Sequence, residues 1–138
     1  MIETYRGLVM AHEVDSNAHM NVQYYTTRFD QANGQLLAKL GFDLQAQKSS
    51  DIGFAFVEMN IKYLHEVLED DPIHIISKVD HIGNKVASTS HQLLNSSNQK
   101  LCAEGLTKWL LFDLKKRKAI PIPELLKAKL IRLTQENL

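Results

Sequence analysis

The hydrophobic positions of the chain follow a helical period in the first third and a strand-like period afterwards. Between Val22 and Leu40 the apolar residues recur every three or four positions, which predicts one long amphipathic helix that ends at Gly41. Residues 5–13 before this helix predict a strand, and the polar residues 43–51 after it predict a loop. We therefore expect the chain to change from helical to extended structure after this loop.

Four further strands are expected in the second half, separated by short polar turns. They cover residues 52–66, 73–82, 85–94 and 100–114, with turns at 69–72, 83–84 and 95–98. Such spacing is typical of antiparallel strands joined in sequence. The tail from Pro123 to Leu138 predicts a second amphipathic helix. This order of elements predicts an α+β fold, in which a single five-stranded antiparallel sheet packs against the long helix.

Length and composition favour one domain without strong electrostatic attraction to large polyanions. The 138 residues fit a single domain, 1–138, and 44% of them are hydrophobic, which is enough for a packed core. The 16 Lys and Arg residues balance the 16 Asp and Glu residues, so the net charge is zero with histidine neutral. A neutral chain has no global field that attracts nucleic acid or an anionic membrane, and we expect neither as a partner.

The cysteine and histidine content indicates which disulfide and metal sites the chain can form. The lengths of its apolar runs indicate in which compartment it is expected. Cys102 is the single cysteine, so neither an intramolecular disulfide nor a two-cysteine zinc site can form. The six histidines show no His-Glu-x-x-His pattern and no helical ligand spacing, and we expect no metal site. No apolar run approaches the ~18 residues of a membrane-spanning helix, and the start lacks the features of a signal peptide, so a cytoplasmic protein is expected.

The segment from Asp15 to Tyr25 holds the densest group of chemically capable side chains. It places polar residues just before the N-terminus of the long helix, where backbone N–H groups are free and the helix dipole is positive. Such groups can hold an oxyanion, and a carboxylate opposite them can attack a carbonyl or activate water. The same residues also suit a simpler role, because Asp15, Asn17 and Asn21 are common loop and helix-cap residues.

This segment resembles the N-terminal motif of hotdog-fold acyl-CoA thioesterases of the 4-hydroxybenzoyl-CoA thioesterase type. That motif has an aspartate, three intervening residues, His-Val/Met-Asn, and then a tyrosine that leads into the central helix. Here the matching residues are Asp15, His19-Met20-Asn21, and Tyr24 or Tyr25. The string from Asn17 to Tyr25 is most similar to the betainyl-CoA thioesterase branch, and the resemblance covers roughly residues 5–123.

The resemblance implies a hotdog fold, in which an antiparallel sheet wraps a long helix, and hydrolysis of an acyl-CoA thioester without a cofactor. Asp15 would serve as the nucleophile or the general base toward the thioester. The backbone N–H groups near residues 21–24 would polarise the thioester carbonyl. Asn17 and His19 would orient Asp15, the water or the substrate.

Further site residues follow from the same resemblance. Asn21, Tyr24 and Tyr25 would contact the substrate. Glu58, in an alternating strand, would act as a base or hold a cationic substrate group if it faces the cleft, and otherwise is a solvated strand residue. Ala18 departs from the pattern, because the family usually has glycine there and alanine adopts a positive φ only at a cost.

Coenzyme A carries phosphates, so basic side chains are candidates for binding it. The single basic run consists of Lys115, Lys116, Arg117 and Lys118. Lys85, next to the turn at 83–84, is a second candidate. A solvated turn is the alternative interpretation of both.

Two other functions remain open beside thioester hydrolysis. The stretch from Asp15 to His19 is reminiscent of the Asp-x-Asn-Pro-x-His arrangement of R-specific enoyl-CoA hydratases, although it is one residue short and lacks the proline. A non-catalytic acyl-CoA-binding protein would keep the pocket without the chemistry. A five-stranded sheet around one helix also leaves strand edges to be covered, and the resemblance implies a homodimer or homotetramer.

Overall fold

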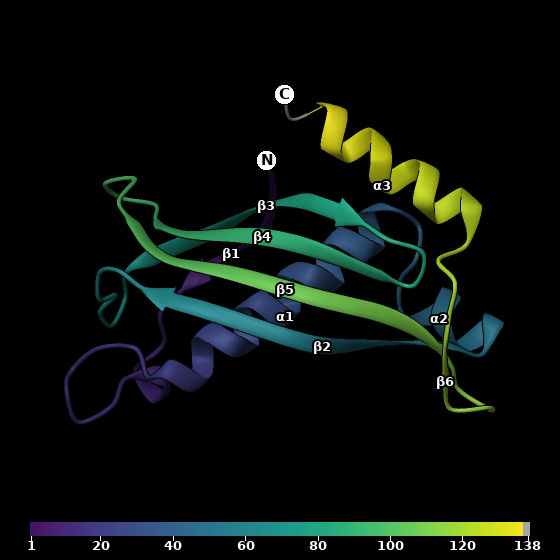
Figure 1. Cartoon of the computed structure of the whole chain (residues 1–138). Helices are drawn as coiled ribbons and strands as arrows, with labels where there is room; N and C mark the ends of the chain where they lie inside the picture. The colour runs from purple at the N-terminus through teal and green to yellow at the C-terminus, as the bar shows by residue number, and fades with distance from the viewer. Residues whose placement is uncertain (137–138) are drawn as a thin grey trace.

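The computed structural model describes residues 1–136 and has the layered α+β architecture that the pattern predicts (Figure 1). The strands are β1 (Ile2–Leu8), β2 (Ile52–Tyr63), β3 (Pro72–Ile82), β4 (Val86–Asn95), β5 (Leu101–Asp113) and β6 (Lys118–Ile120). The helices are α1 (Val22–Lys39), α2 (Leu44–Ser50) and α3 (Glu124–Glu136), with a 3-10 helix, η1, at Ala11–Glu13. The predicted final helix is confirmed, and its last positions, 137–138, lie outside the described residues.

The strands pair antiparallel in one sheet of order β1-β3-β4-β5-β2, and α1 lies across one of its faces (Figure 1). The sheet has six strands and not the expected five, because β6 pairs with the end of β5, Leu111 opposite Ile120. Three residues are too few to show an alternating pattern in the sequence. A long helix enclosed by an antiparallel sheet is the arrangement that the resemblance implies.

The first strand is shorter than predicted and begins earlier. The sequence predicts a strand over residues 5–13, whereas β1 ends at Leu8 and the chain then turns into η1. Glu13 stabilises this turn, because its Oε1 accepts a hydrogen bond from the Met10 N–H at 2.8 Å. The short 3-10 helix places Glu13 inside the protein, where only 2% of it is exposed.

The predicted loop at 43–51 is wrong for most of its length, because it contains α2. Asp43 caps this helix by accepting a hydrogen bond from the Ala46 N–H at 2.9 Å. Asp51 ends it in the left-handed region, with φ of 53°. None of the α2 side chains is buried, so the segment has no apolar stripe from which a helix could be predicted.

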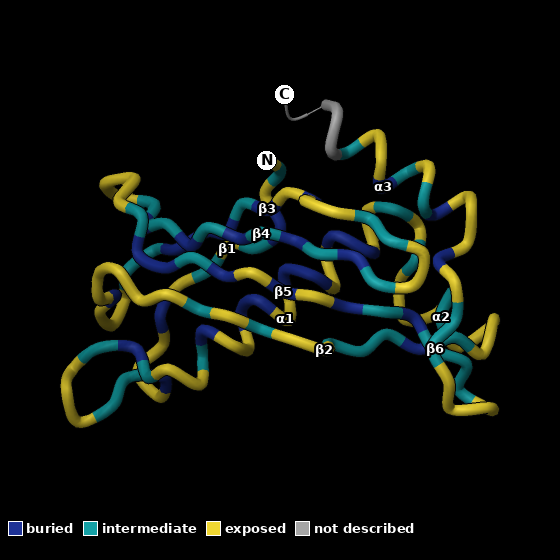
Figure 2. The backbone as a smooth tube through the Cα atoms, viewed as in Figure 1, coloured by how far each residue is buried: buried dark blue, intermediate teal, exposed yellow. Residues whose placement is uncertain are grey.

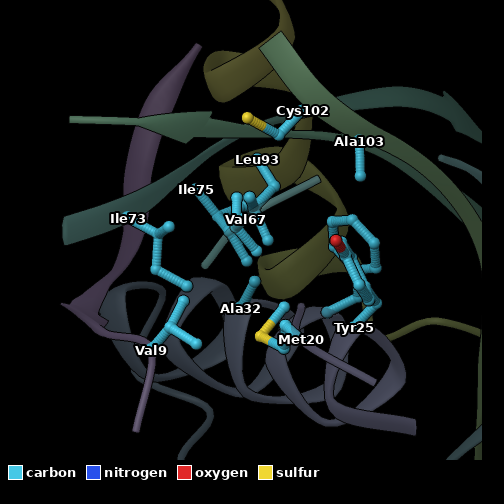
Figure 3. Close-up of a cluster of buried hydrophobic side chains, with 11 residues drawn as sticks. Val9, Met20, Tyr25, Ala32, Val67, Ile73, Ile75, Leu93, Cys102 and Ala103 are labelled. Carbon is cyan, nitrogen blue, oxygen red and sulfur yellow. The ribbon is translucent and has the colours of Figure 1, made fainter. Parts of the chain in front are cut away.

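The buried apolar residues form two clusters, and Figure 2 shows buried positions recurring along α1 and the central strands. The first surrounds Tyr25 and Phe29 on the N-terminal half of α1, and Figure 3 shows its members meeting from the helix and several strands. The second surrounds Leu36 and Trp109. Gly105 on β5 permits the close packing, since a Cβ at that position would lie 3.1 Å from the Phe29 ring. The core therefore follows the apolar face that the helical period predicts.

The helix α3 covers the part of the sheet edge that β1 leaves open. β1 pairs with β3 only over residues 72–77, and α3 packs against β3. Leu130 of α3 is fully buried in the same cluster as Val79 of β3. Lys129 Nζ donates a hydrogen bond to the Leu40 carbonyl at 3.1 Å, which ties α3 to the end of α1. β1 therefore forms one edge of the sheet, with α3 packed against the part of β3 beyond it, and β2 forms the other edge.

A buried hydrogen-bond network joins α1 to four strands. Asn33 of α1 donates through Nδ2 to Thr107 Oγ1 at 3.0 Å, and the same Nδ2 lies 3.1 Å from His91 Nε2. His91 Nδ1 lies 2.7 Å from Ser77 Oγ, which lies 2.7 Å from Thr4 Oγ1. Burial lowers the pKa of His91 from 6.5 to about 4, so the imidazole is neutral in the core at neutral pH.

Acidification is expected to destabilise the fold through His91. At pH values above 6.5 the imidazole is neutral in both states, whereas between pH 6.5 and 4 the unfolded chain binds a proton that the folded protein does not. The two pKa values correspond to a loss of roughly 3 kcal/mol of unfolding free energy by pH 4.

Urea unfolding at neutral pH and near pH 4 checks this expectation, with His91→Gln as the comparison. The variant has no imidazole to titrate, so its loss of stability between the two pH values should be smaller by that amount. An equal loss in both proteins would show that His91 does not carry the effect.

Candidate active site

The loop before α1 is closed by its own backbone hydrogen bonds. The Asp15 N–H donates to the His19 carbonyl at 3.1 Å, and the Ala18 N–H donates to the Asp15 carbonyl at 2.9 Å. Outside the loop, the Met20 N–H donates to the Val67 carbonyl at 2.9 Å. The loop is therefore fixed both within itself and against the segment that follows β2, although Figure 2 shows that much of its surface is exposed.

Ala18 adopts the left-handed conformation that a glycine would take at this position. Its φ is 63°, a value that costs an L-residue roughly 1–2 kcal/mol. Ala18, which departs from the family pattern, therefore adopts the loop shape that glycine would give, at the cost of a strained positive φ.

The substitution Ala18→Gly is expected to raise the free energy of unfolding by up to about 1 kcal/mol. Glycine removes the strain, but its greater conformational freedom in the unfolded chain reduces the gain in unfolding free energy by about 0.4–1 kcal/mol. The backbone shape does not change, so turnover should stay within about twofold of the wild type. Urea unfolding and steady-state kinetics measure the two quantities, and a clear loss of stability would argue against a strained Ala18.

Asp15 presents an ionised carboxylate at the mouth of this loop. Its Oδ1 accepts the Asn17 N–H at 2.8 Å, and its Oδ2 accepts Nδ2 of Asn21 at 3.0 Å. The Asn17 hydrogen bond, then that of Asn21 and then the charge of His19 lower the pKa of Asp15 below its ordinary value. About a quarter of the side chain stays exposed, at 23%. The carboxylate is thus charged, oriented and accessible.

Asn21 links this carboxylate to the N-terminus of α1. Its Oδ1 caps the helix by accepting the Gln23 N–H at 3.1 Å, while its Nδ2 donates to Asp15. The N–H groups of Asn21 and Tyr24 donate to the Glu13 and Asn21 carbonyls. Among the backbone N–H groups of residues 21–24, the Val22 N–H is therefore the one that donates to no other protein group in the described part of the chain.

His19 lies between two carboxylates. Its Nε2 is 3.9 Å from Asp15 Oδ1, and its Nδ1 is 3.1 Å from Glu66 Oε2. Glu66 follows β2 and is 62% exposed. The two residues are 47 positions apart in the chain, so the sequence gives no local signal for this contact. Of the residues predicted to orient Asp15, Asn17 contacts it through its backbone N–H, and His19 approaches it at ion-pair distance.

A buried ion pair lies beneath the loop and was not predicted. Arg28 Nη2 on α1 contacts Glu13 Oε2, and the Arg28 guanidinium lies 5.0 Å from the centre of the Tyr5 ring. The two charged residues are 8% and 2% exposed. The pair fixes η1 to α1, and the Arg28 guanidinium over the Tyr5 ring adds a contact with β1.

A cavity of about 330 Å³ opens beside the loop. It is lined by His19, Met20, Val22, Tyr25, Tyr63, Leu64, His65 and Glu66. The Tyr25 and Tyr63 rings meet edge to face, with their centres 4.9 Å apart. Tyr25 is 4% exposed, and burial raises its pKa to about 12, so the phenol stays neutral. Figure 3 shows Tyr25 and Met20 together at the start of α1.

Tyr24, the other predicted tyrosine, points to a different partner. Its hydroxyl donates to the His12 carbonyl at 3.3 Å, and its ring meets the His12 ring edge on, 6.0 Å between centres. Tyr24 therefore holds η1 against α1, whereas Tyr25 lines the cavity.

The structure does not bring Glu58 to Asp15. Met59 and Ile61 on the same strand pack against the core, so Glu58 points to the other face of the sheet. There its Oε2 lies 2.8 Å from Lys108 Nζ, and 57% of the side chain is exposed. The interpretation of Glu58 as a solvated strand residue fits this position, and within one chain it does not face the cavity.

The basic candidates lie in turns at the opposite end of the sheet from the loop before α1 (Figure 1). Residues 115–118 form the turn from β5 into β6, where Lys115 Nζ lies 3.2 Å from Asp51 Oδ2. Arg117 stacks over the Phe112 ring at 5.1 Å. Lys85 lies in the turn between β3 and β4, beside a separate cavity of about 520 Å³. These residues therefore do not meet the Asp15 loop within one chain.

Among residues 1–136, no three His, Cys, Asp or Glu side chains are grouped as metal ligands. No described helix has both the length and the apolar character needed to cross a membrane. Cys102 is 1% exposed, its Sγ donates to the Lys100 carbonyl at 3.3 Å, and burial raises the pKa of its thiol. It is a core residue and takes no part in the loop.

Comparisons with known proteins agree with this geometry. A family model described as thioesterase-like superfamily matches residues 9–130. The betainyl-CoA thioesterase of Pseudomonas aeruginosa is 28% identical over 102 residues, which cover 73% of this chain and 64% of that protein. The chain thus spans slightly under two thirds of that relative's length.

Solved structures with the same fold include several thioesterases. A gentisyl-coenzyme A thioesterase has a TM-score of 0.83 at 20% identity, with 92% of this chain and 98% of that chain covered. A Staphylococcus aureus protein solved in complex with CoA has a TM-score of 0.89 at 16% identity, with 98% and 87% covered. At these identities the likeness concerns the fold, and together with the family match it shows that the chain belongs to the thioesterase-like superfamily and has the hotdog fold.

Proposed function

We propose that the protein hydrolyses an acyl-CoA thioester to a free acid and CoA. The observation that carries this proposal is the ionised Asp15 carboxylate, held by Asn17 and Asn21 beside the N-terminus of α1, 3.9 Å from His19, which lines a cavity. A lowered pKa keeps this group charged at neutral pH. A charged carboxylate either attacks the thioester carbonyl directly or removes a proton from an attacking water.

The oxyanion that forms on the carbonyl needs a donor that is not already engaged. The Val22 N–H meets this need, since in the described part of the chain it has no other acceptor and lies at the positive end of the α1 dipole. Asn21 places this end and Asp15 in a fixed relation, because its side chain binds both. The relative positions of the attacking group, Asp15, and the oxyanion donor, the Val22 N–H, are thereby fixed before substrate binds.

We infer that the working unit is a homodimer formed through β2, or a tetramer built from such dimers. In the described chain β2 is bonded to β5 on one side only, and its twelve residues offer a long row of backbone donors and acceptors. A two-fold axis perpendicular to the sheet would pair β2 antiparallel with its copy. The partner's Lys115 to Lys118 would then lie near the Asp15 end of this subunit, where the phosphates of CoA need cations. A mass of one chain in sedimentation experiments would contradict this assembly.

A thiol-release screen tests the proposed reaction. Purified protein is offered short, branched, aromatic, long-chain and betainyl-CoA thioesters, and free CoA is titrated with a thiol reagent. The betainyl thioester belongs in the screen because the P. aeruginosa relative is a betainyl-CoA thioesterase. Turnover of at least one thioester is the expected result, and binding without release from any of them would favour an acyl-CoA-binding protein. Hydration of crotonyl-CoA would instead favour the hydratase alternative.

A further inference from the structure

The loop that carries Asp15 is the tip of a short backbone hairpin. Val14 and Met20 pair antiparallel across this hairpin. At its base the Asn21 N–H donates a hydrogen bond to the Glu13 carbonyl at 2.8 Å. Glu13, the last residue of η1, and Asn21, the N-cap of α1, therefore face each other where the hairpin meets the rest of the protein.

Each side of the hairpin is anchored to a different part of the protein. On the second side the Met20 N–H donates to the Val67 carbonyl at 2.9 Å. On the first side the anchor is the Glu13 side chain, whose Oε2 contacts Arg28 Nη2 on α1 and whose Oε1 accepts the Met10 N–H at 2.8 Å. Because both oxygens are bound and the side chain is 2% exposed, Glu13 restrains its own backbone, including its carbonyl.

The contacts lead from the Glu13 carbonyl to Asp15 through one residue. The Asn21 N–H binds that carbonyl, and Asn21 Nδ2 donates to Asp15 Oδ2 at 3.0 Å. The other oxygen of the carboxylate is held from within the loop, by the Asn17 N–H at 2.8 Å. The direction of Oδ2 therefore depends on the position of Asn21, which depends in turn on the base of the hairpin.

We propose that Glu13 is a positioning residue for the reaction, which sets the orientation of the Asp15 carboxylate through its contacts with Arg28 and Asn21. This inference rests on the proposed thioesterase function. Glu13 does not line the cavity beside the loop, so its effect reaches the substrate there only through Asp15. A misplacement of about 1 Å at a reacting group can lower a rate by about a hundredfold, so a small shift at the base of the hairpin is enough to matter.

The test uses a variant that removes the anchor without leaving a lone buried charge. Glu13→Gln combined with Arg28→Met, here called the neutral-pair variant, removes both charges of the pair. The glutamine can still accept the Met10 N–H, whereas the ionic contact with α1 is lost. We expect kcat per folded molecule to fall by about tenfold to a hundredfold, with KM within about twofold of the wild type.

The matched control is Leu130→Ala, which opens a cavity in the other apolar cluster, around Trp109. It should destabilise the fold while kcat per folded molecule and KM stay near the wild type. Steady-state kinetics give kcat and KM, and urea unfolding gives the folded fraction of each protein. An equal fall in kcat per folded molecule in both variants would show that Glu13 only stabilises the fold, and the proposal would be wrong.

The pKa of Asp15 reports its orientation without any turnover. In the wild type the hydrogen bonds from Asn17 and then Asn21, and then the charge of His19, lower this pKa. Loss of the Asn21 hydrogen bond should raise the pKa toward its ordinary value. In the single variant Glu13→Gln the lost negative charge alone would lower the pKa of Asp15, so a rise there separates a change of orientation from a change of charge. Titration of the carboxyl carbon signal by NMR measures this pKa.

A thermodynamic cycle with Asn21→Ala tests the route of the effect. If Glu13 acts through Asn21, the neutral-pair changes should lower kcat by less than about twofold once residue 21 is alanine. Independent effects would instead multiply, and the proposed route would be wrong.

Failure of this proposal is distinguishable from failure of the proposed reaction. A raised Asp15 pKa in the neutral-pair variant, with the pKa unchanged in Leu130→Ala, supports the positioning role even if no thioester is hydrolysed. An Asp15 pKa as low as in the wild type overturns the role even if hydrolysis is found. If the neutral-pair variant does not fold, Glu13→Asp replaces it with the same expected results, because its side chain is charged but one methylene too short to keep both contacts.

Discussion

Replacing Asp15 with asparagine should lower kcat on the best thioester by roughly a thousandfold or more, because the amide can neither attack a carbonyl nor accept a proton from water. The side chains are nearly equal in size and the site is partly exposed, so the folded state should persist. Asparagine can still accept one of the two hydrogen bonds from Asn17 and Asn21, so the loss of stability should be only about 1 kcal/mol.

The matched control for this variant is Asp30→Asn, the same change on the exposed face of α1. It should leave both kcat and the free energy of unfolding near the wild type. Single-turnover thiol release and urea unfolding on the three proteins measure the two quantities. Wild-type kcat in the Asp15 variant would show that the residue has a structural role, and the proposed mechanism would have to be abandoned.

The substitution Arg28→Met is expected to lower the free energy of unfolding by about 3–5 kcal/mol. Glu13 is 2% exposed, so removing its cationic partner leaves a carboxylate inside the protein without a counter-charge. The link from η1 to α1 and the contact with the Tyr5 ring are lost at the same time. Because η1 leads directly into the loop that holds Asp15, catalysis should weaken along with stability.

A double variant distinguishes the effect of the charge from that of packing. Glu13→Gln with Arg28→Met removes both charges and should be more stable than Arg28→Met alone, which a thermodynamic cycle measures by chemical unfolding. Arg6→Met breaks the exposed pair with Glu3 and should leave stability near the wild type, since water already screens that contact. A similar loss for Arg6→Met and Arg28→Met would show that burial of the pair is unimportant.

The parts of the fold that the sequence predicts are those with a repeating pattern. The helix α1 was expected to run from Val22 to Leu40 and runs to Lys39, because its apolar period, the Asn21 cap and the glycine after it all agree. The elements without such a pattern were missed. The surface helix α2 buries none of its residues, and β6 has only three.

The candidate site also has a part that the sequence predicts and a part that it does not. Asp15, Asn21 and the helix N-terminus are neighbours along the chain, so their chemistry could be inferred from one short segment. Glu66 lies beside them only because β2 returns the chain to the start of α1, and no local sequence pattern indicates its contact with His19. The buried Glu13–Arg28 pair is equally invisible, since charged residues are usually solvated.

The two edges of the sheet differ in a way that limits how many copies can associate through them. On one edge the seven-residue β1 is followed by α3, so no long run of free backbone remains there. The other edge, β2, is long and has no such cover in residues 1–136. Joining two β2 edges uses the longer open edge of each molecule, and the other end of the sheet in residues 1–136 is the seven-residue β1. The cover that α3 gives to β3 therefore shortens the second edge to β1 alone, which disfavours edge-to-edge growth beyond a pair.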